Sequence, residues 1–182
     1  MKKPVVDSRP ARVIGQGRFL TLVEEAGWEY VIRPHVRGIV VMVPITPDGE
    51  LVLVEQARVA VHRRVVELPA GMVGDRDGDE HESFADAAHR ELVEETGFQA
   101  REMVPLAEGP IAVGVSDEAI SFFHARDLTR VGPGGGDASE DITVHVVPLP
   151  DLRRFLRDKA DEGYAVDSKI YAGLFLAGVA LT

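Results

Sequence analysis

The pattern of apolar and polar positions predicts strands in the front part of the chain. Residues 18–34, "RFLTLVEEAGWEYVIRP", break at Ala26-Gly27 into two arms of strand-forming residues, which is typical of a hairpin. Residues 38–58, "GIVVMVPITPDGELVLVEQAR", place a Pro-Asp-Gly turn between two runs rich in Val, Ile and Leu. We therefore expect two successive β-hairpins.

Strands and helices share the back part of the chain. The runs "ISFFHAR" (120–126) and "ITVHVVPL" (142–149) predict strands, whereas residues 151–160 and 168–180 have helical character. Between the two strands, "VGPGGGDASED" (131–141) is the strongest loop signal. Strands in front and helices behind indicate an α/β fold in which helices cover a sheet.

One helix is defined at both ends by its own sequence. Ser83, with Asp86 three residues later, is a capping pair, and Gly97 supplies a stop, so we expect a helix from about Phe84 to Thr96. Its apolar positions recur with helical spacing and form one stripe, which predicts that this face packs against the core.

Three glutamates of this helix lie on one arc. At about 100° per residue, Glu91, Glu94 and Glu95 fall side by side along the border of the apolar stripe. Most glutamate-rich helices are solvated surfaces, and that interpretation stays open on spacing alone. Because only Arg90 is close in sequence to neutralise them, a divalent cation is a natural counter-charge, and hard oxygen donors favour Mg²⁺ or Mn²⁺.

Composition narrows the setting. The chain has 182 residues, 45% of them hydrophobic, which suits one well-buried core. Its formal net charge of -10 argues against general affinity for nucleic acid or anionic membranes. There is no cysteine, which removes thiolate chemistry and disulfides. The start lacks the apolar run of a secretory signal, and no apolar stretch reaches the ~18 residues of a membrane span, so we expect a soluble, cytoplasmic protein.

The glutamate-rich helix carries a family signature. From Glu82 to Phe98, the sequence "ESFADAAHRELVEETGF" fills every specified position from the first glutamate onward of the Nudix motif, and it therefore resembles the Nudix hydrolase family. The family motif opens with a glycine six residues before that glutamate, where this chain has Arg76. Gly71 is the natural candidate, which implies a five-residue insertion within residues 72–81. The acidic residues of this insertion are interpreted as a solvated turn.

Flanking segments resemble one branch of that family, the ADP-ribose and nucleoside-diphosphate-sugar pyrophosphatases. The segments are "VVELPAGMV", "SDEAISFFHARDL" and "SEDITVHVVPL", preceded by "WEYVIRPHVRGIVVMVPI". The resemblance implies a Nudix fold, an α/β/α sandwich around a mixed β-sheet with an N-terminal β-hairpin region. It also implies a homodimer that exchanges residues 1–35, while residues 36–182 form the hydrolase domain, the whole being a single structural domain.

The resemblance also implies the catalytic machinery. Glu91 and Glu95 are the expected principal Mg²⁺ ligands, Glu94 supports a second ion, and the Ala70 carbonyl completes the shell. Mn²⁺ is a possible substitute. Glu140, after the glycine loop, is the expected base that activates water, with Asp141 or Glu118 as substitutes. Glu82 is expected either to pair with Arg90 or to meet the metal through water.

The remaining positions carried over from the branch concern the substrate. Trp28 resembles the aromatic residue that stacks on the nucleobase across a dimer interface, although an isolated Trp is more often part of a core. The other expected substrate-binding residues are Glu29, Arg33, Arg58, Met72, Ser116 and Glu118. The segment "IAVGVSDE" lacks the Ser-Pro-Gly sequence that the branch often has there, which weakens the expectation of strict ADP-ribose preference.

We therefore predict Mg²⁺-dependent hydrolysis of nucleoside diphosphate sugars to a nucleoside monophosphate and a sugar 1-phosphate. ADP-ribose is the leading substrate, and GDP-mannose and related nucleotide sugars follow. Two alternatives stay open: a house-cleaning nucleoside triphosphate pyrophosphatase and a non-catalytic nucleotide-sugar binding module. Release of inorganic pyrophosphate from a triphosphate would identify the first, and binding without turnover would identify the second.

Overall fold

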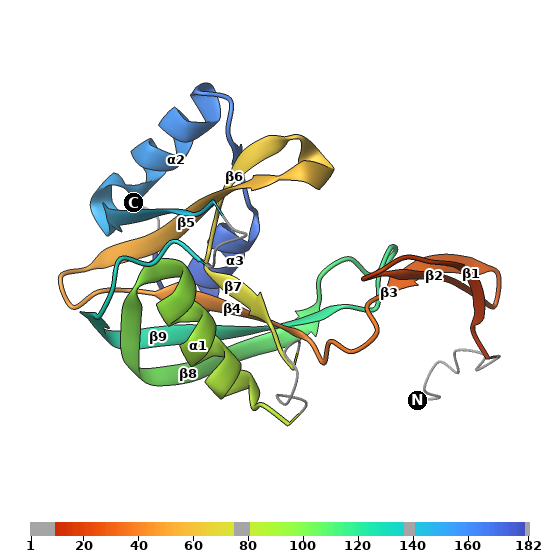
Figure 1. The fold of residues 1–182 in the computed structure, drawn as a ribbon. Coiled ribbons are helices and arrows are strands. Elements are labelled where there is room, and N and C mark those ends of the chain that lie inside the picture. Colours follow the sequence, from red (N-terminus) through yellow and green to blue (C-terminus); the bar gives the residue numbers. More distant parts are fainter. Residues whose placement is uncertain (1–9, 75–80, 137–140, 181–182) are drawn as a thin grey trace, which may run out of the picture.

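The computed structural model describes residues 10–74, 81–136 and 141–180 (Figure 1). One antiparallel sheet has the order β1-β2-β3 and consists of β1 (Arg12–Gln16), β2 (Thr21–Glu25) and β3 (Trp28–Ile32). The expected hairpin is confirmed, since β2 and β3 join at Ala26 and Gly27, which both have positive φ. β1 adds a third strand that the sequence pattern did not predict.

Two four-stranded sheets form the body. The first runs β7 (Ala70–Met72), β4 (Ile39–Pro44), β9 (Ala119–Arg130) and β8 (Phe98–Pro110). The second runs β10 (Thr143–Pro148), β5 (Glu50–Arg58), β6 (Arg63–Glu67) and β11 (Ala165–Val166). Short 3₁₀ turns lie at Val59–Val61 and Leu149–Asp151. The β4–β9 and β6–β11 pairs are parallel and the others antiparallel, so the sheets are mixed.

The second hairpin predicted from the sequence does not form as a paired ladder. The turn is present, with the Thr46 N–H donating to the Glu50 carbonyl at 2.9 Å, but β4 and β5 enter different sheets. Among the described residues, a single isolated bridge, Ile45 to Leu51, joins the two arms. The physical reason is that both arms are continuous apolar runs, which suit strands covered on both faces better than a half-exposed hairpin.

Helices cover both faces of the body. The core residues Val40 and Met42 of β4 belong to the cluster beneath α1 (Phe84–Thr96). The alternate residues Val41 and Val43 belong to the cluster that includes residues of α2 (Leu152–Asp161) and α3 (Lys169–Leu176). This alternation follows from the strand period of two. It confirms the expected α/β/α sandwich.

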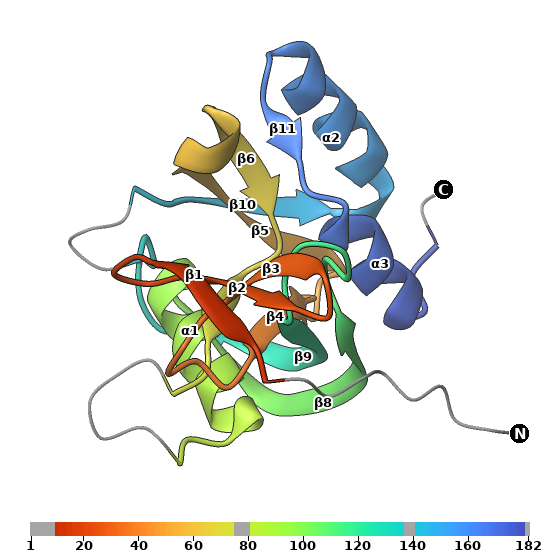
Figure 2. The ribbon, with the colours of Figure 1, turned by 90° about the vertical axis from the view of Figure 1, so that its right-hand side faces the viewer.

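The three-stranded N-terminal sheet projects from the body in Figure 1 and lies in front of it in Figure 2. Its β3 contacts the segment between β8 and β9, because the Val31 N–H donates to the Val115 carbonyl at 2.9 Å. The large apolar side chains Val13, Phe19 and Trp28 of this sheet region are 58%, 63% and 70% exposed. Apolar surface left this open is typical of a contact with another molecule.

Within the described residues, no helix has the length and apolar character that a membrane crossing requires. The insertion expected within residues 72–81 lies largely outside the described residues.

Candidate active site

The helix α1 begins and ends where its sequence predicts. The Ser83 side chain accepts a hydrogen bond from the Asp86 N–H at 3.1 Å, and Gly97 adopts φ 73° at the C-terminal end. Ala88 and Leu92 are fully buried and attach the helix to the sheet. The helix therefore presents its glutamates at a fixed position beside β7.

Two glutamates of α1 lie directly against β7. Glu95 is 4% exposed, and its Oε2 accepts a hydrogen bond from the Ala70 N–H at 3.1 Å. Glu91 packs so closely on Gly71 that a Cβ at this position would overlap the Glu91 carboxylate. The glycine of "LPAG" is thus required by the close approach of Glu91.

Arg90 is shared among three glutamates. Its Nε and Nη2 donate to the two carboxylate oxygens of Glu82 at 2.8 and 3.0 Å. Its Nη1 lies 2.5 Å from Glu91 Oε1 and 3.6 Å from Glu94 Oε2. The hydrogen bonds to Glu82, together with Glu91, raise the pKa of Arg90 further above its ordinary value. Of the two roles expected for Glu82, pairing with Arg90 is confirmed.

A cleft of about 540 Å³ opens beside these groups. Its lining combines the three glutamates of α1 and residues of β7 with the cationic residues Arg33, Arg58 and Lys169. The described lining residues are Arg33, Ile39, Gln56, Arg58, Glu67, Leu68, Ala70, Gly71, Met72, Glu91, Glu94, Glu95, Ile111, Ile120 and Lys169. Acidic and basic groups facing one space suit a ligand that carries anionic groups and a bound cation.

The cations of the cleft are held by carboxylates. Arg33 Nε lies 2.8 Å from Glu118 Oε1, which joins two of the expected substrate-binding residues. Arg58 Nε lies 2.7 Å from Glu67 Oε2. Burial raises the pKa of the Glu67 carboxyl, although Arg58 opposes this effect. Each arginine is therefore oriented before a ligand arrives, which lowers the entropic cost of binding.

The glycine loop is attached to the end of α1. The Gly135 N–H donates to the Glu95 carbonyl at 2.8 Å, and the Gly136 N–H donates to the Glu94 carbonyl at 3.0 Å. These bonds satisfy backbone acceptors that a helix end leaves open. Glu140, the expected base, lies outside the described residues.

The structure brings most of the expected site residues together. Ala70, Met72, Glu91, Glu94, Glu95, Arg33 and Arg58 all line the cleft, and Glu118 contacts Arg33. Trp28, Glu29 and Ser116 are not among the described lining residues. Trp28 and Glu29 begin β3 on the projecting sheet, and Ser116 forms an isolated bridge with Val31 of the same strand.

Three polar lining residues were missed from the sequence: Gln56, Glu67 and Lys169. Glu67 directly precedes "LPAG" and Gln56 lies in "EQAR", so a wider reading of those two segments would have included them. Lys169, at the start of α3, has a close ion pair with Asp167. No local signal connects it with a helix almost eighty residues earlier, because the fold alone brings them together.

The donor types of the cleft fit a divalent cation. Glu91, Glu94 and Glu95 offer hard oxygen ligands on one wall, beside the backbone of Ala70. Within the part of the chain that the structure describes, no three acidic or histidine side chains are already arranged as a metal shell. Instead, Glu91 contacts Arg90 and Glu95 contacts the Ala70 amide, so a metal would compete with these contacts.

The fold is an α/β sandwich, and a glutamate-rich helix and cationic side chains line its cleft. These two features together indicate the class of protein. A family model, the NUDIX domain, matches residues 34–171. The chain therefore belongs to the NUDIX domain family. This range contains the glutamate helix, both body sheets and all the described residues that line the cleft except Arg33.

Two curated relatives are about 30% identical to this chain over the aligned residues. The ADP-ribose pyrophosphatase of Bacillus subtilis (strain 168) is 30% identical over 134 residues, which cover 71% of this chain and 70% of that protein. The methanol dehydrogenase activator of Bacillus methanolicus is 29% identical over 123 residues, covering 67% of this chain and 64% of that protein. The match thus spans about two thirds of the length of these relatives.

A solved structure supports the fold. The crystal structure of an ADP compounds hydrolase has a TM-score of 0.69 and 23% sequence identity, and it covers 92% of this chain and 89% of its own. At this identity the likeness bears on the fold alone.

Proposed function

We propose that this NUDIX domain protein hydrolyses the pyrophosphate bond of nucleoside diphosphate sugars, with ADP-ribose as the leading substrate and GDP-mannose and related nucleotide sugars next. The products are a nucleoside monophosphate and a sugar phosphate, which is ribose 5-phosphate from ADP-ribose and a sugar 1-phosphate from GDP-mannose. The observation that carries the proposal is the cleft itself, whose lining combines Glu91, Glu94 and Glu95 with Arg33 and Arg58. The name of the Bacillus subtilis relative supports the choice of ADP-ribose.

The cleft residues have two different roles in the proposed reaction, which are to bind the metal ion and to bind the phosphates. Glu91, Glu94, Glu95 and the Ala70 carbonyl would hold Mg²⁺, with Mn²⁺ as a possible substitute. A bound divalent cation neutralises the diphosphate and lowers the barrier to attack by water. Arg33 and Arg58 grip the phosphate oxygens, and their ion pairs with Glu118 and Glu67 orient them. Met72 contributes a backbone contact.

Glu140 is proposed as the base that takes the proton from the attacking water. Two described features support this assignment. The preceding Gly135 and Gly136 are bonded to the backbone of Glu95 and Glu94, and the following Asp141 is bonded to Arg64 of β6. The described residues on either side of Glu140 are therefore bonded to residues of α1 and β6.

A second copy of the chain is proposed to complete the nucleobase side of the site. Trp28 is 70% exposed on the projecting sheet, beyond the described lining of the cleft. In a homodimer that exchanges residues 1–35, the partner would supply Trp28 and Glu29, and Ser116 would lie at the junction. Light scattering tests the dimer, which would be refuted by a monomer at working concentration.

One experiment tests the reaction. The protein is incubated with Mg²⁺ and separate nucleotide sugars or nucleoside triphosphates in oxygen-18 water, and the products are identified by mass spectrometry. We expect a nucleoside monophosphate and a sugar phosphate (ribose 5-phosphate from ADP-ribose, a sugar 1-phosphate from GDP-mannose), with one of the two products labelled. Inorganic pyrophosphate from a triphosphate, with poor turnover of ADP-ribose, would reverse the choice of substrate. Binding without any product would indicate a binding module. A cytoplasmic location stays a prediction, and cell fractionation tests it.

A further inference from the structure

Gln56 of β5 lines the cleft, and the proposed function gives it no role. The residue is only 8% exposed, yet within the described part of the chain its side-chain amide makes no hydrogen bond. None of the fully buried side-chain nitrogens and oxygens of the described residues lacks a partner, so the amide atoms of Gln56 reach the open space of the cleft. Because buried amides are nearly always hydrogen-bonded, this arrangement points to a partner that the chain itself does not supply.

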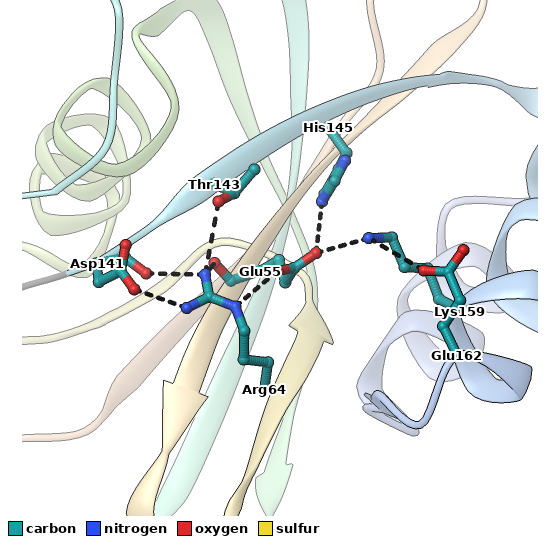
Figure 3. Close-up of polar contacts among 7 residues, drawn as sticks. All are labelled: Glu55, Arg64, Asp141, Thr143, His145, Lys159 and Glu162. Carbon is teal, nitrogen blue, oxygen red and sulfur yellow. Dashed lines mark hydrogen bonds and ion pairs between the residues drawn. The ribbon is translucent and has the colours of Figure 1, made fainter.

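The strand geometry turns Gln56 towards the cleft. Side chains alternate along β5, so Gln56 and Arg58 share one face of the sheet and Glu55 lies on the other. On that other face the Glu55 carboxylate is already surrounded by donors, which are Arg64, His145 and Lys159 (Figure 3). Gln56 is thus separated by the sheet from this network, and its amide is open to a molecule in the cleft.

The polar neighbours of Gln56 on the cleft side are charged, and they are paired with one another. Glu67 lies diagonally across from Gln56 in the β5–β6 ladder, within reach of a long side chain. Glu67 Oε2 lies 2.7 Å from Arg58 Nε, and Lys169, which also lines the cleft, has a close ion pair with Asp167. Two formal positive charges are therefore balanced by two formal negative charges.

This part of the lining suits a hydroxyl group better than an anion. An amide offers N–H donors and an acceptor oxygen, and a hydroxyl group also donates and accepts, so the two match. A phosphate group offers acceptors alone and would leave the amide oxygen of Gln56 beside a negative charge. The paired ions around Gln56 hold no excess positive charge for a further anion. The chemistry favours a neutral group that carries hydroxyls, as a sugar does.

The place of Gln56 in the chain also suits a sugar next to the diphosphate. Arg58, which is proposed to grip the phosphates, is two residues away on the same strand face. Glu67 precedes Ala70 by three residues, so their Cα atoms lie within roughly 11 Å of each other. A nucleobase stacks best on an aromatic side chain, and the described residues that line the cleft include none.

We propose that Gln56 is a specificity-determining residue that hydrogen-bonds the hydroxyl groups of the sugar beyond the diphosphate. This inference rests on the proposed function, in which the substrate is a nucleoside diphosphate sugar. It specifies a neutral, hydroxylated sugar as the group that the cleft recognises. Gln56 takes no part in the attack of water on the diphosphate.

The test compares two substrates that differ only in the sugar. ADP-ribose carries it, whereas the β-methyl ester of ADP keeps the adenosine and the diphosphate and has a methyl group in its place. Gln56→Met keeps the length of the side chain and removes the amide. With Mg²⁺ and the whole chain, Gln56→Met should lower kcat/KM for ADP-ribose about 10-fold to 100-fold, because the sugar hydroxyls lose their partners. The value for the ester should stay within about twofold of wild type.

The matched control is Gln99→Met. Gln99 is an exposed glutamine of β8, and it does not belong to the described lining of the cleft. This variant should keep the wild-type kcat/KM for both substrates. If Gln56→Met lost equally on ADP-ribose and the ester, or lost on neither, Gln56 would not recognise the sugar and the inference would be overturned.

A second pair of substrates tests the nucleobase as the alternative partner of Gln56. IDP-ribose differs from ADP-ribose in the base alone. The preference between these two compounds should be the same in wild type and Gln56→Met. A change in this preference, with the ratio of ADP-ribose to ester unaltered, would assign Gln56 to the base and refute its assignment to the sugar.

Failure of this inference can be distinguished from failure of the proposed function. If wild type hydrolyses no nucleotide sugar, the proposed function fails, and isothermal titration with ADP-ribose and the ester takes the place of kinetics. The inference then stands if Gln56→Met weakens the binding of ADP-ribose alone, and it fails if both affinities change alike or if ADP-ribose does not bind.

Two further measurements keep the test decisive. If the ester binds without being cleaved, its inhibition constant against ADP-ribose replaces kcat/KM and should be the same in wild type and Gln56→Met. If circular dichroism shows that Gln56→Met does not fold, Gln56→Ala replaces it, with the same expected loss on ADP-ribose alone. An equal loss on both substrates in that variant would overturn the inference.

Discussion

The two charged clusters of this protein are arranged in opposite ways. Beside the cleft, one arginine, Arg90, is shared among Glu82, Glu91 and Glu94. Around Glu55, one carboxylate is shared among Arg64, Lys159 and His145. Adding a cation to the first cluster relieves repulsion among like charges, whereas the second already surrounds its carboxylate with donors. The difference separates a site suited to an external cation from one suited to holding the fold.

The largest effect is expected where the proposed chemistry is removed. Glu140→Gln should lower kcat by about 100-fold or more, as loss of a general base does, while the Mg²⁺ titration stays close to wild type. Steady-state kinetics with ADP-ribose measure it. The control is Glu108→Gln, which changes an exposed glutamate of β8 and should leave kcat at the wild-type value. A kcat near wild type in Glu140→Gln would move the base elsewhere.

Glu95→Gln should weaken the binding of Mg²⁺. Removing one negative oxygen donor beside Ala70 should raise the Mg²⁺ concentration needed for half-maximal activity about 10-fold or more and lower activity with it. Isothermal titration with Mg²⁺ alone measures binding independently of turnover. An unchanged titration would refute the ligand role. The same measurement on Glu55→Gln should show no change, which contrasts the two clusters directly.

A substitution that leaves the net charge unchanged can also disturb the cleft. Gly71→Ala places a methyl group where the Glu91 side chain lies, so Glu91 must move and activity should fall on the order of 10-fold. Gly109→Ala is the matched control, because a Cβ there meets nothing within 4 Å. Circular dichroism should show that both variants are folded. Equal activity in the two variants would mean that the position of Glu91 is not critical.

The smallest effect on chemistry and the clearest effect on stability are expected at Glu55. Glu55→Gln should lower the free energy of unfolding by about 1–3 kcal/mol at pH 7, because Arg64 and Lys159 lose their shared anion. The folded-state pKa of Glu55 is lowered from 4.5 to about 2, so this contribution is full above about pH 4.5. It should disappear as the pH falls towards 2.

Urea unfolding of wild type and Glu55→Gln at several pH values measures the difference between their free energies of unfolding. The other titrating groups are present in both proteins, so their contributions cancel in this difference. Arg64, Lys159, His145 and Asp141 are the charged or titratable groups around Glu55 (Figure 3). A difference in stability that is independent of pH between 7 and 3 would contradict the charged state of Glu55.

The parts of the fold that the sequence predicted are those specified by neighbouring residues. The bounds of α1 follow from Ser83 and Gly97, and the β2–β3 turn follows from Ala26-Gly27. β1 was missed because all five of its residues are exposed, so it has no alternation to detect. β8 was missed because prolines and charged residues interrupt its apolar positions. The pairing of β4 was wrong because its parallel partner, β9, lies far along the chain.

The same division applies to the site. The spacing of Glu91, Glu94 and Glu95 predicted one wall of the cleft, because a single helix carries all three. The cationic residues of the lining, Arg33, Arg58 and Lys169, come from three distant segments, and only tertiary packing brings them together. The Glu55 network was not predicted either, since its partners also come from separate elements.

The pairing of β4 with β7 gives the cleft residues a second role, which is to favour the correct alignment of these two strands. Both faces of β4 are buried. A shift of this strand by one residue would turn its apolar side chains to the opposite faces, which are also buried, so the hydrophobic effect would penalise the shift little. Such a slip would displace Ala70 and Gly71, which pair with Val41 and Val40. A side chain at position 71 would displace Glu91, and Glu95 accepts from one particular amide, so the proposed metal-binding glutamates also favour the strand alignment on which they depend.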